Sequence, residues 1–257
     1  MRIITGFHAI EEELKAITET DKSAVAAKIN GLSLVFSKPG PRVKKILASA
    51  ASLGIPATEK DMPTLDKMVS PLPPTARDHR GILLVMENAE QAAPLRMDDI
   101  IKELALREKA LVLILDSITD PQNVGAIIRS ADQFGVDLVV LPEHRGATDF
   151  EVISRTSAGA SSWVNIVLVP NLVRAVEQLK EAGFWIYGAD AGGTAINKVD
   201  TAEKTALVMG SEGTGMARLL KQKCDTIISI PTIGKLDSLN VSVAAGVLLY
   251  EIRRKAL

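Results

Sequence analysis

The sequence predicts an α/β protein with a small amino-terminal domain and a larger domain built on a mostly parallel sheet. The chain has 257 residues and 47% hydrophobic content, which is enough for one large and one small core. Short apolar runs such as residues 111–115 alternate with amphipathic patterns such as residues 172–182. That alternation is typical of a parallel sheet with helices on both faces.

The amino-terminal region contains the elements of a compact α/β domain. Apolar residues recur at helical spacing at Phe7, Ile10, Leu14 and Ile17, and we expect a surface helix there. Residues 32–36 have strand character, Pro41 suits the first turn of a helix ending near residue 53, and residues 80–87 form a closing strand. We therefore predict a first domain over residues 1–87.

A basic group surrounds the Gly40-Pro41 turn of this domain, comprising Lys38, Arg42, Lys44 and Lys45. A solvated helix face is the simpler explanation for such a group, and phosphate binding is the alternative. The formal net charge of the chain is −1, so overall charge does not indicate an RNA-binding protein. Any basic track must come from clustering in three dimensions.

The second domain is predicted over residues 96–257, after a linker at 88–95 that lacks apolar periodicity. Its strands are expected at 111–115, 138–141, 164–168, 185–188, 206–209 and 226–230. In such sheets, ligands bind beyond the carboxyl ends of the strands.

Three polar, glycine-containing loops in this domain each lie between a predicted strand and a helix. The first, within 115–129, holds Asn123, Gly125 and Arg129; the second, within 207–216, holds Gly210, Glu212, Gly213 and Gly215; the third, within 228–246, holds Ser238 and Asn240. We expect chemistry where these loops meet. The spacing G-x-x-G-x-G differs from the dinucleotide fingerprint, so a nicotinamide enzyme is not expected.

In this order and spacing, the loops resemble the three motifs of the SpoU (TrmH) family of RNA ribose 2′-O-methyltransferases, in the SPOUT superfamily. The matching patterns are N-x-G-x-x-x-R, G-x-E-G-x-G and S-L-N-V-S, the last at 238–242. Gly6, His8 and Ala9, together with the triplet at 79–81, are most similar to members that methylate a guanosine of 23S ribosomal RNA. A transfer-RNA target, or a non-catalytic RNA-binding protein of the same fold, stays open.

The resemblance implies S-adenosylmethionine as the cofactor and RNA as the partner. It implies that Gly210, Ile230 and Leu239 line the cofactor pocket in a carboxyl-terminal trefoil knot. It also implies that Arg129 acts on the ribose hydroxyl, as base or as stabiliser of the alkoxide, while the remaining polar residues of the motifs position the reactants: Asn123, Glu212, Ser238 and Asn240. For Glu212, a salt bridge to a nearby arginine is the structural alternative.

The resemblance further implies a first domain similar to small ribosomal RNA-binding proteins and a homodimer formed through the knotted domain. The apolar, small-residue helix at 241–249 offers a face for close packing between subunits. The single Cys224 excludes an internal disulfide, and His8, His79 and His144 lack metal-ligand spacing, so we expect no metal. The sequence has no signal peptide and no apolar run of membrane length, so we expect a cytoplasmic protein without a membrane partner.

Overall fold

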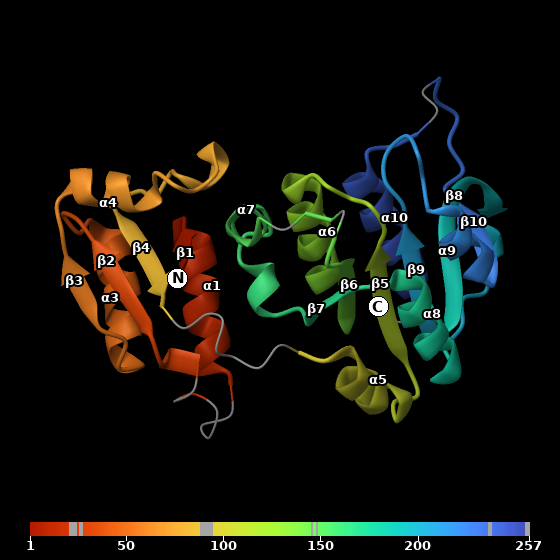
Figure 1. Cartoon of the computed structure of the whole chain (residues 1–257), viewed down its shortest axis with the longest axis horizontal. Helices are drawn as coiled ribbons and strands as arrows, with labels where there is room; N and C mark the ends of the chain where they lie inside the picture. Colours follow the sequence, from red (N-terminus) through yellow and green to blue (C-terminus); the bar gives the residue numbers. More distant parts are fainter. Residues whose placement is uncertain are drawn as a thin grey trace. The chain divides into compact units, whose positions relative to one another are not determined.

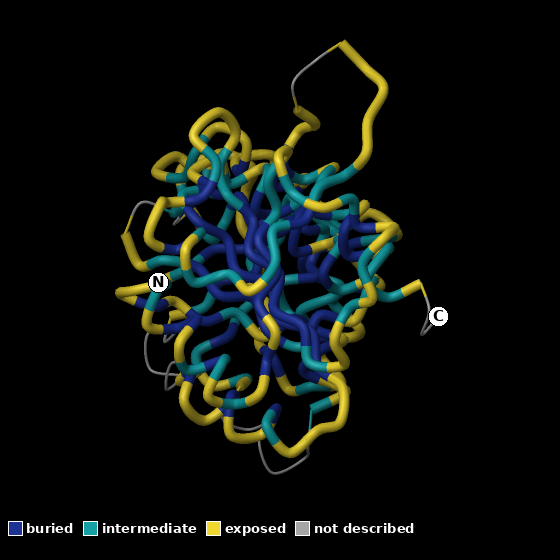
Figure 2. Tube along the Cα trace, turned by 90° about the vertical axis from the view of Figure 1, so that its right-hand side faces the viewer, coloured by how far each residue is buried: buried dark blue, intermediate teal, exposed yellow. Residues whose placement is uncertain are grey.

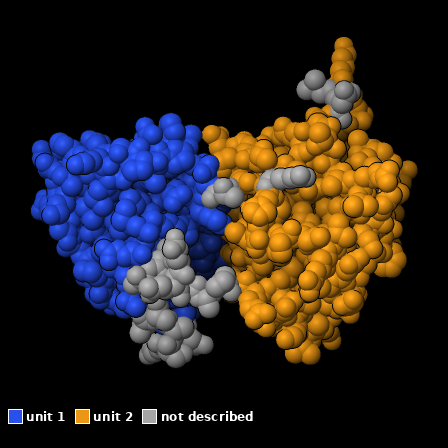
Figure 3. All heavy atoms as spheres, in the orientation of Figure 1, with its two compact units in different colours: residues 1–94, 149–163 blue, residues 95–148, 164–257 orange. Residues whose placement is uncertain are grey.

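The computed structural model of the chain describes residues 1–20, 25, 28–87, 95–144, 146–147, 149–235 and 238–254. Two compact units make up the chain: unit 1 comprises residues 1–94 and 149–163, and unit 2 comprises residues 95–148 and 164–257 (Figure 3). The predicted linker, apart from Leu95, lies outside the described residues. The chain therefore begins in unit 1, passes into unit 2, returns to unit 1 for residues 149–163, and ends in unit 2.

Unit 1 contains a four-stranded sheet in the order β1-β4-β2-β3 (Figure 1). Its strands are β1 (Arg2–Thr5), β2 (Leu32–Phe36), β3 (Ala57–Glu59) and β4 (Ile82–Met86). Strand β4 runs antiparallel to β1 and β2, and β2 runs parallel to β3. The helices and 3-10 turns are α1 (Phe7–Thr18), α3 (Pro41–Ser52), α4 (Met62–Val69), η1 (Pro74–Ala76), α7 (Phe150–Thr156) and η2 (Ala160–Ser162).

Both faces of this sheet are covered, because successive side chains of a strand point to opposite sides. Ile82 and Leu84 of β4 pack with apolar residues of α1 and α3. Leu83 and Val85 pack with apolar residues of α4. All four side chains are buried, which explains why the closing strand is an unbroken apolar run.

Residues 149–163, which the sequence placed in the second domain, pack with unit 1. The indole Nε1 of Trp163 donates to Glu12 Oε2 of α1 at 2.9 Å, and the Arg155 guanidinium donates to Asp78 Oδ2 at 2.9 Å. Gly159 has a φ of +90°, and a Cβ there would lie 2.5 Å from the Glu12 Cβ. Only glycine satisfies both the backbone conformation and the close approach to α1.

Unit 2 contains a six-stranded sheet in the order β10-β8-β9-β5-β6-β7, with every pairing parallel. The strands are β5 (Ala110–Leu115), β6 (Leu138–Pro142), β7 (Ile166–Val169), β8 (Trp185–Ala195), β9 (Lys204–Met209) and β10 (Thr226–Ser229). The helices and 3-10 turn are α5 (Met97–Ala105), α6 (Pro121–Gln133), α8 (Leu172–Glu181), η3 (Ile196–Lys198), α9 (Arg218–Lys223) and α10 (Val241–Arg253).

The central strands of this sheet are buried on both faces. All six residues of β5 are buried, and Figure 2 colours buried residues dark blue. Val112 and Ile114 belong to a core with residues of α5 and α8. The alternate side chains point to the opposite face, where α6 and α10 pack against each other. The predicted α/β fold with a parallel sheet is confirmed.

All six strands of unit 2 differ from the sequence prediction at one or both ends, by one or two residues except in β8. Strand β7 begins two residues later than expected, and β8 continues seven residues beyond residue 188 to Ala195. The extension of β8 pairs with β10 after a register shift. A Cβ at Gly193 would lie 2.6 Å from the backbone carbon of Ile228, so glycine lets these two backbones approach.

Among the described residues, no helix is both long enough and apolar enough to cross a lipid bilayer.

Candidate active site

The first two motif loops lie side by side at the carboxyl edge of the unit 2 sheet. Strands β5 and β9 are paired as far as Leu115 and Met209, and their loops begin at the next residues. Asp120 begins α6 as an N-cap that accepts a hydrogen bond from Gln122 N at 2.9 Å. This cap places Asn123 in the first turn of α6, next to the loop after β9 that holds Glu212.

The side chain of Asn240 joins all three motifs. Its Nδ2 donates to Asn123 Oδ1 at 3.1 Å and to Glu212 Oε1 at 2.8 Å. Its Oδ1 caps α10 by accepting from Ser242 N at 2.9 Å. Glu212 Oε1 also accepts from Val241 N at 2.9 Å, so a carboxylate lies at the positive end of the α10 dipole. Glu212 thus binds an asparagine and a helix start, and it forms no salt bridge with an arginine among the described residues.

The loop that carries Glu212 is a tight hairpin. Ser211 and Gly215 exchange two backbone hydrogen bonds, at 3.2 and 3.0 Å. Gly213 and Gly215 have φ values of +90° and +65°, which glycine adopts without strain. A Cβ at Gly210 would lie 2.2 Å from the carbonyl carbon of Gly215. The glycines of motif two therefore let the loop turn back on itself and present Glu212 at its tip.

Arg129 and Ser238 are exposed, and neither makes a hydrogen bond or ion pair with another described residue. Arg129 lies six residues beyond Asn123 on α6, which is about 9 Å along the helix axis. The structure brings together Asn123, Glu212 and Asn240, and it leaves Arg129 and Ser238 available to a ligand.

Of the three residues expected at the cofactor pocket, Gly210 and Leu239 lie on the chain segments that carry Glu212 and Asn240. Gly210 begins the hairpin, Ile230 follows β10, and Leu239 precedes Asn240. The Leu239 side chain is 38% exposed and Ile230 is partly buried. Partly exposed apolar side chains beside backbone N–H and C=O groups suit an adenine ring and an amino-acid tail.

Sequence reasoning missed Asp116, the first residue after β5. Its side chain is buried, and its Oδ2 accepts from Ala217 N at 2.6 Å, at the far end of the hairpin. The available signal was a carboxylate directly after a buried strand, in a loop already singled out. Buried carboxylates are rare unless they are hydrogen-bonded, so this position was worth marking.

In unit 2, Asp190 and Cys224 have perturbed pKa values. A hydrogen bond from Lys221, reinforced by Gly192 N, lowers the pKa of Asp190 in the extension of β8. Burial raises the pKa of the Cys224 thiol to about 11, which makes this cysteine a poor nucleophile near neutral pH. In the part of the chain that the structure describes, no group of three or more His, Cys, Asp or Glu side chains could hold a metal ion.

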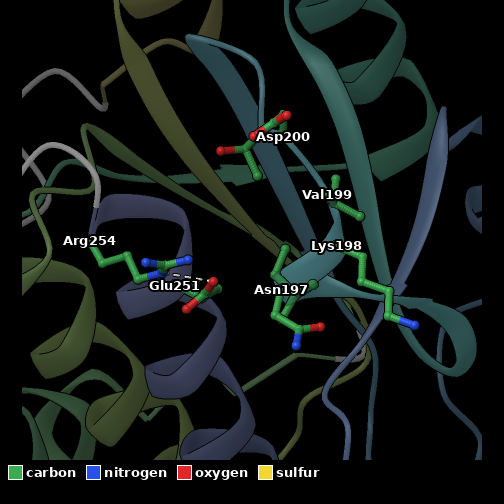
Figure 4. Close-up of a pocket in the computed structure, with 8 residues that line it drawn as sticks. Asn197, Lys198, Val199, Asp200, Glu251 and Arg254 are labelled. Carbon is green, nitrogen blue, oxygen red and sulfur yellow. Dashed lines mark ion pairs between the residues drawn. The ribbon is translucent and has the colours of Figure 1, made fainter.

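A surface hollow lies elsewhere in unit 2, lined by residues 196–201 with Glu251 and Arg254. Figure 4 shows the ion pair between Glu251 in the last turn of α10 and Arg254 just beyond it, whose charged atoms are 2.8 Å apart in the structure. The motif residue Asn240 is at the other end of that 13-residue helix, which is about 20 Å long. The hollow is therefore separate from the motif cluster.

The basic group in unit 1 is only partly free. Arg42 binds Glu11 through two hydrogen bonds, at 2.6 and 3.0 Å, and this contact lowers the pKa of the carboxyl. Lys38, Lys44 and Lys45 are exposed.

His79 of unit 1 is buried. Its Nδ1 accepts a hydrogen bond from Gly81 N at 3.0 Å, so its Nε2 carries the proton that it donates to Asp66 Oδ1 at 3.0 Å.

Comparison with known proteins decides the family. The model of the SpoU rRNA Methylase family matches residues 110–250, more than half of the chain. The chain belongs to the SpoU rRNA methylase family. The 23S rRNA (guanosine-2'-O-)-methyltransferase RlmB of Neisseria meningitidis is 35% identical over 99% of this chain and 95% of its own. The TrmH family tRNA/rRNA methyltransferase YacO of Bacillus subtilis is 36% identical over 93% of each chain.

Solved structures of this family share the fold. The AdoMet-bound rRNA methyltransferase of Sinorhizobium meliloti superposes with a TM-score of 0.75 at 22% identity, over 99% of this chain and 87% of its own. The SpoU methyltransferase AviRb of Streptomyces viridochromogenes, in complex with AdoMet, has a TM-score of 0.74 at 23% identity, over 99% and 90%. The family match confirms the enzyme class expected from the motifs, an RNA methyltransferase dependent on S-adenosylmethionine.

Proposed function

We propose that this SpoU family protein methylates the ribose 2′-hydroxyl of a guanosine in 23S ribosomal RNA. The similarity to RlmB of Neisseria meningitidis extends along both chains and supports this substrate. The observation that carries the proposal is the hydrogen-bonded cluster of Asn123, Glu212 and Asn240, which joins three motifs far apart in sequence. Capping α10 alone requires only Asn240, and the two further partners indicate a site with fixed geometry.

The residues fit S-adenosylmethionine by their chemistry. Gly210 begins the hairpin that carries Glu212, and Leu239 lies just before the start of α10. Glu212 holds these two segments together by its hydrogen bond with Val241 N. Their backbone groups and the apolar side chains of Leu239 and Ile230 would hold the adenine and methionine parts of the cofactor. When bound, S-adenosylmethionine supplies a methyl group already activated on a sulfonium, so the reaction needs no metal.

The polar side chains then have to orient the ribose and help its hydroxyl to lose a proton. Arg129 is exposed and without a partner among the described residues, so its planar guanidinium is free to bind the phosphate next to the target ribose. From there it stabilises negative charge that develops on the 2′-oxygen. A guanidinium stays protonated in nearly all proteins, which favours this role over that of a base in the resting state. Asn123 and Asn240 orient the ribose, and Ser238 provides a hydroxyl beside them.

We further propose that unit 1 binds RNA, as its likeness to small ribosomal proteins implied. The exposed Lys38, Lys44 and Lys45 support this role, whereas Arg42 is already bound to Glu11. The cytoplasm, where ribosomal RNA is assembled, is the compartment this substrate requires.

We also propose that unit 2 forms a trefoil knot and pairs with a second copy. The contacts of Asn240 with Asn123 and Glu212 support the knot, because they bring the segment after β10 back to the loops that follow β5 and β9. An apolar stripe on the outer face of α10 supports the homodimer: Val243, Val247 and Tyr250 are 51%, 39% and 52% exposed and share one helix face.

A transfer-RNA substrate is the second candidate. It is favoured by the TrmH/SpoU tRNA modifying enzyme of A. aeolicus, which is 31% identical over 63% of this chain and 86% of its own, with a TM-score of 0.52. A non-catalytic RNA-binding protein is the third, and the intact cluster of motif residues argues against it.

Methyl transfer from labelled S-adenosylmethionine to purified, unmodified 23S ribosomal RNA, 16S ribosomal RNA and transfer RNA distinguishes these candidates. We expect label only in 23S RNA, located on a ribose by nuclease digestion and mass spectrometry. Label in transfer RNA alone would select the second candidate. Binding of RNA without transfer, combined with no thermal shift on addition of S-adenosylmethionine, would select the third.

A further inference from the structure

We propose that Asp116 is a positioning residue for methyl transfer, and that it acts by holding the hairpin of residues 210–217 where Glu212 can reach the start of α10. The inference concerns the site of the proposed function and rests on it for its kinetic consequence. Its structural consequence, the position of Glu212, can be measured without any reaction.

Asp116 is almost completely buried, at 6% exposure, and two of its polar contacts connect the first motif loop to β9 and to the hairpin. Its backbone N–H donates to Met209 O at 2.8 Å, which extends the β5–β9 ladder by one bond. Its Oδ1 accepts from Ser117 Oγ at 3.0 Å and its Oδ2 accepts from Ala217 N at 2.6 Å. Hydrogen bonds to a carboxylate are roughly twice as strong as neutral ones.

The bond to Ala217 fixes the returning strand of the hairpin. The outgoing strand continues directly from β9, so the sheet already holds Gly210. The return, from Gly215 to Ala217, is held by the buried Met216 side chain, by the backbone pair of Ser211 with Gly215, and by Asp116. Of these, Asp116 provides the only side-chain hydrogen bond between the hairpin's return and the loop after β5 among the described residues.

The position of the hairpin determines the position of Glu212. Glu212 is at the tip, and its Oε1 accepts from Val241 N at 2.9 Å and from Asn240 Nδ2 at 2.8 Å. Both distances leave little room for a shift, because hydrogen bonds weaken quickly beyond about 3.2 Å. A continuous series of contacts thus connects Asp116, through Ala217 and Glu212, to Asn240 and Asn123.

The same sheet provides a matched control. Asp137 is also a carboxylate that binds β5, with Oδ2 accepting from Leu111 N at 2.8 Å and Oδ1 accepting from Arg107. It does so at the amino end of the strand, away from the motif loops. Asp137→Ala removes a similar carboxylate-to-backbone bond, together with ion pairs to Arg107 and to Arg253 at the far end of α10, without touching the hairpin.

The test compares Asp116→Ala, Asp116→Asn and Asp137→Ala in the full chain, each alone and combined with Glu212→Ala. Asparagine has nearly the shape of aspartate, and it can accept from Ala217 N while donating to Ser117 Oγ. Should Asp116→Ala fail to fold, Ala217→Pro removes the same bond from the donor side, because the Ala217 φ of −54° is one that proline adopts.

Amide hydrogen exchange at Val241 reports the position of Glu212 directly. We expect about tenfold or faster exchange in Asp116→Ala, the scale of one lost hydrogen bond to a charged group. Asp116→Asn and Asp137→Ala should leave Val241 protected. Unchanged Val241 exchange in a folded Asp116→Ala or Ala217→Pro protein would overturn the inference, whether or not the protein methylates RNA.

Single-turnover rates at saturating RNA and S-adenosylmethionine supply the kinetic part. Asp116→Ala should slow transfer by about tenfold or more in the wild-type background, and much less in the Glu212→Ala background, because the two residues act through one contact series. Asp137→Ala should have equal effects in both backgrounds. Equal effects of Asp116→Ala in both backgrounds would overturn the inference. A wild-type protein without transferase activity would refute the proposed function and leave the exchange result intact.

Discussion

Replacing Gly210 with alanine tests whether the motif-two hairpin sets the geometry of the site. The added Cβ would lie 2.2 Å from Gly215 C, 2.3 Å from Met216 N and 2.6 Å from Gly215 O. All three neighbours are backbone atoms, so rotation of a side chain cannot relieve the contact. To restore an ordinary contact of 3.4 Å, the hairpin's return must move by about 1.2 Å relative to β9.

The expected cost of Gly210→Ala has two parts. Overpacking of this kind destabilises proteins by about 1–3 kcal/mol, which urea unfolding would detect. Displacement of Glu212 by about 1 Å from Asn240 should reduce methyl transfer by about 100-fold, since misplacements of that size have such effects in active sites. The rate is measured in single turnover with saturating substrates, at a temperature where both proteins are folded.

Gly246→Ala is the matched control. Gly246 is in α10, and a Cβ there would lie at an ordinary 3.5 Å from Ser130 Oγ. Alanine favours a helix over glycine by about 1 kcal/mol, so this protein should be as stable as wild type or more stable, with unchanged transfer. A Gly210→Ala protein with wild-type stability and wild-type turnover would refute the reasoning about the hairpin.

Four further predictions follow from the structure. Arg129→Ala should reduce single-turnover methyl transfer by about 100-fold, with little change in cofactor affinity measured by calorimetry. Arg129→Lys should be nearly as damaging if the planar guanidinium matters. Wild-type turnover of the Arg129→Ala protein would remove Arg129 from the mechanism. Val247→Asp should convert a dimer to a monomer by light scattering, and a wild-type mass of 27.5 kDa at micromolar concentration would exclude the dimer. The pKa of Asp190 is lower in the folded protein than its ordinary value of 3.8, so its contact with Lys221 stabilises the fold above pH 3.8, and this stabilisation is lost as the pH falls through the pKa of the folded state. Lys221→Met should therefore lower the urea midpoint at pH 7, and the difference in midpoint from wild type should shrink below pH 3.8. A fragment that starts at Leu95 should bind S-adenosylmethionine in calorimetry but lose RNA affinity. Proteases should cut this fragment within residues 149–163, because these residues pack with unit 1 in the full chain. Loss of cofactor binding in the folded fragment would contradict the proposed division of roles between the units.

The sequence was informative wherever local chemistry determines local structure. The buried run of β5 and the alternation of strand, polar loop and helix around each motif follow from residue type and spacing. These features were sufficient to predict the parallel sheet and the edge at which the motifs meet. The short strands β1 and β3 were missed, because three or four residues are too few to show a period of two.

Contacts between residues distant in sequence were not accessible in the same way. Nothing local indicates that Asn240 donates to both Asn123 and Glu212, or that Asp116 binds Ala217, 101 residues away. The packing of Trp163 on Glu12 depends on a segment leaving one unit for the other. Such pairings are determined by the complete fold, and the pattern of a local sequence does not predict them.

The most direct test of the central claim is a map of ribose methylation in ribosomal and transfer RNA from cells that lack this protein. Primer extension at limiting nucleotide concentration, checked by mass spectrometry, would show which 2′-O-methyl groups disappear. We predict the loss of one methylated guanosine in 23S RNA, restored by the wild-type gene and not by a gene encoding Arg129→Ala. An unchanged map of ribose methylation, or restoration by the Arg129→Ala protein, would contradict the account.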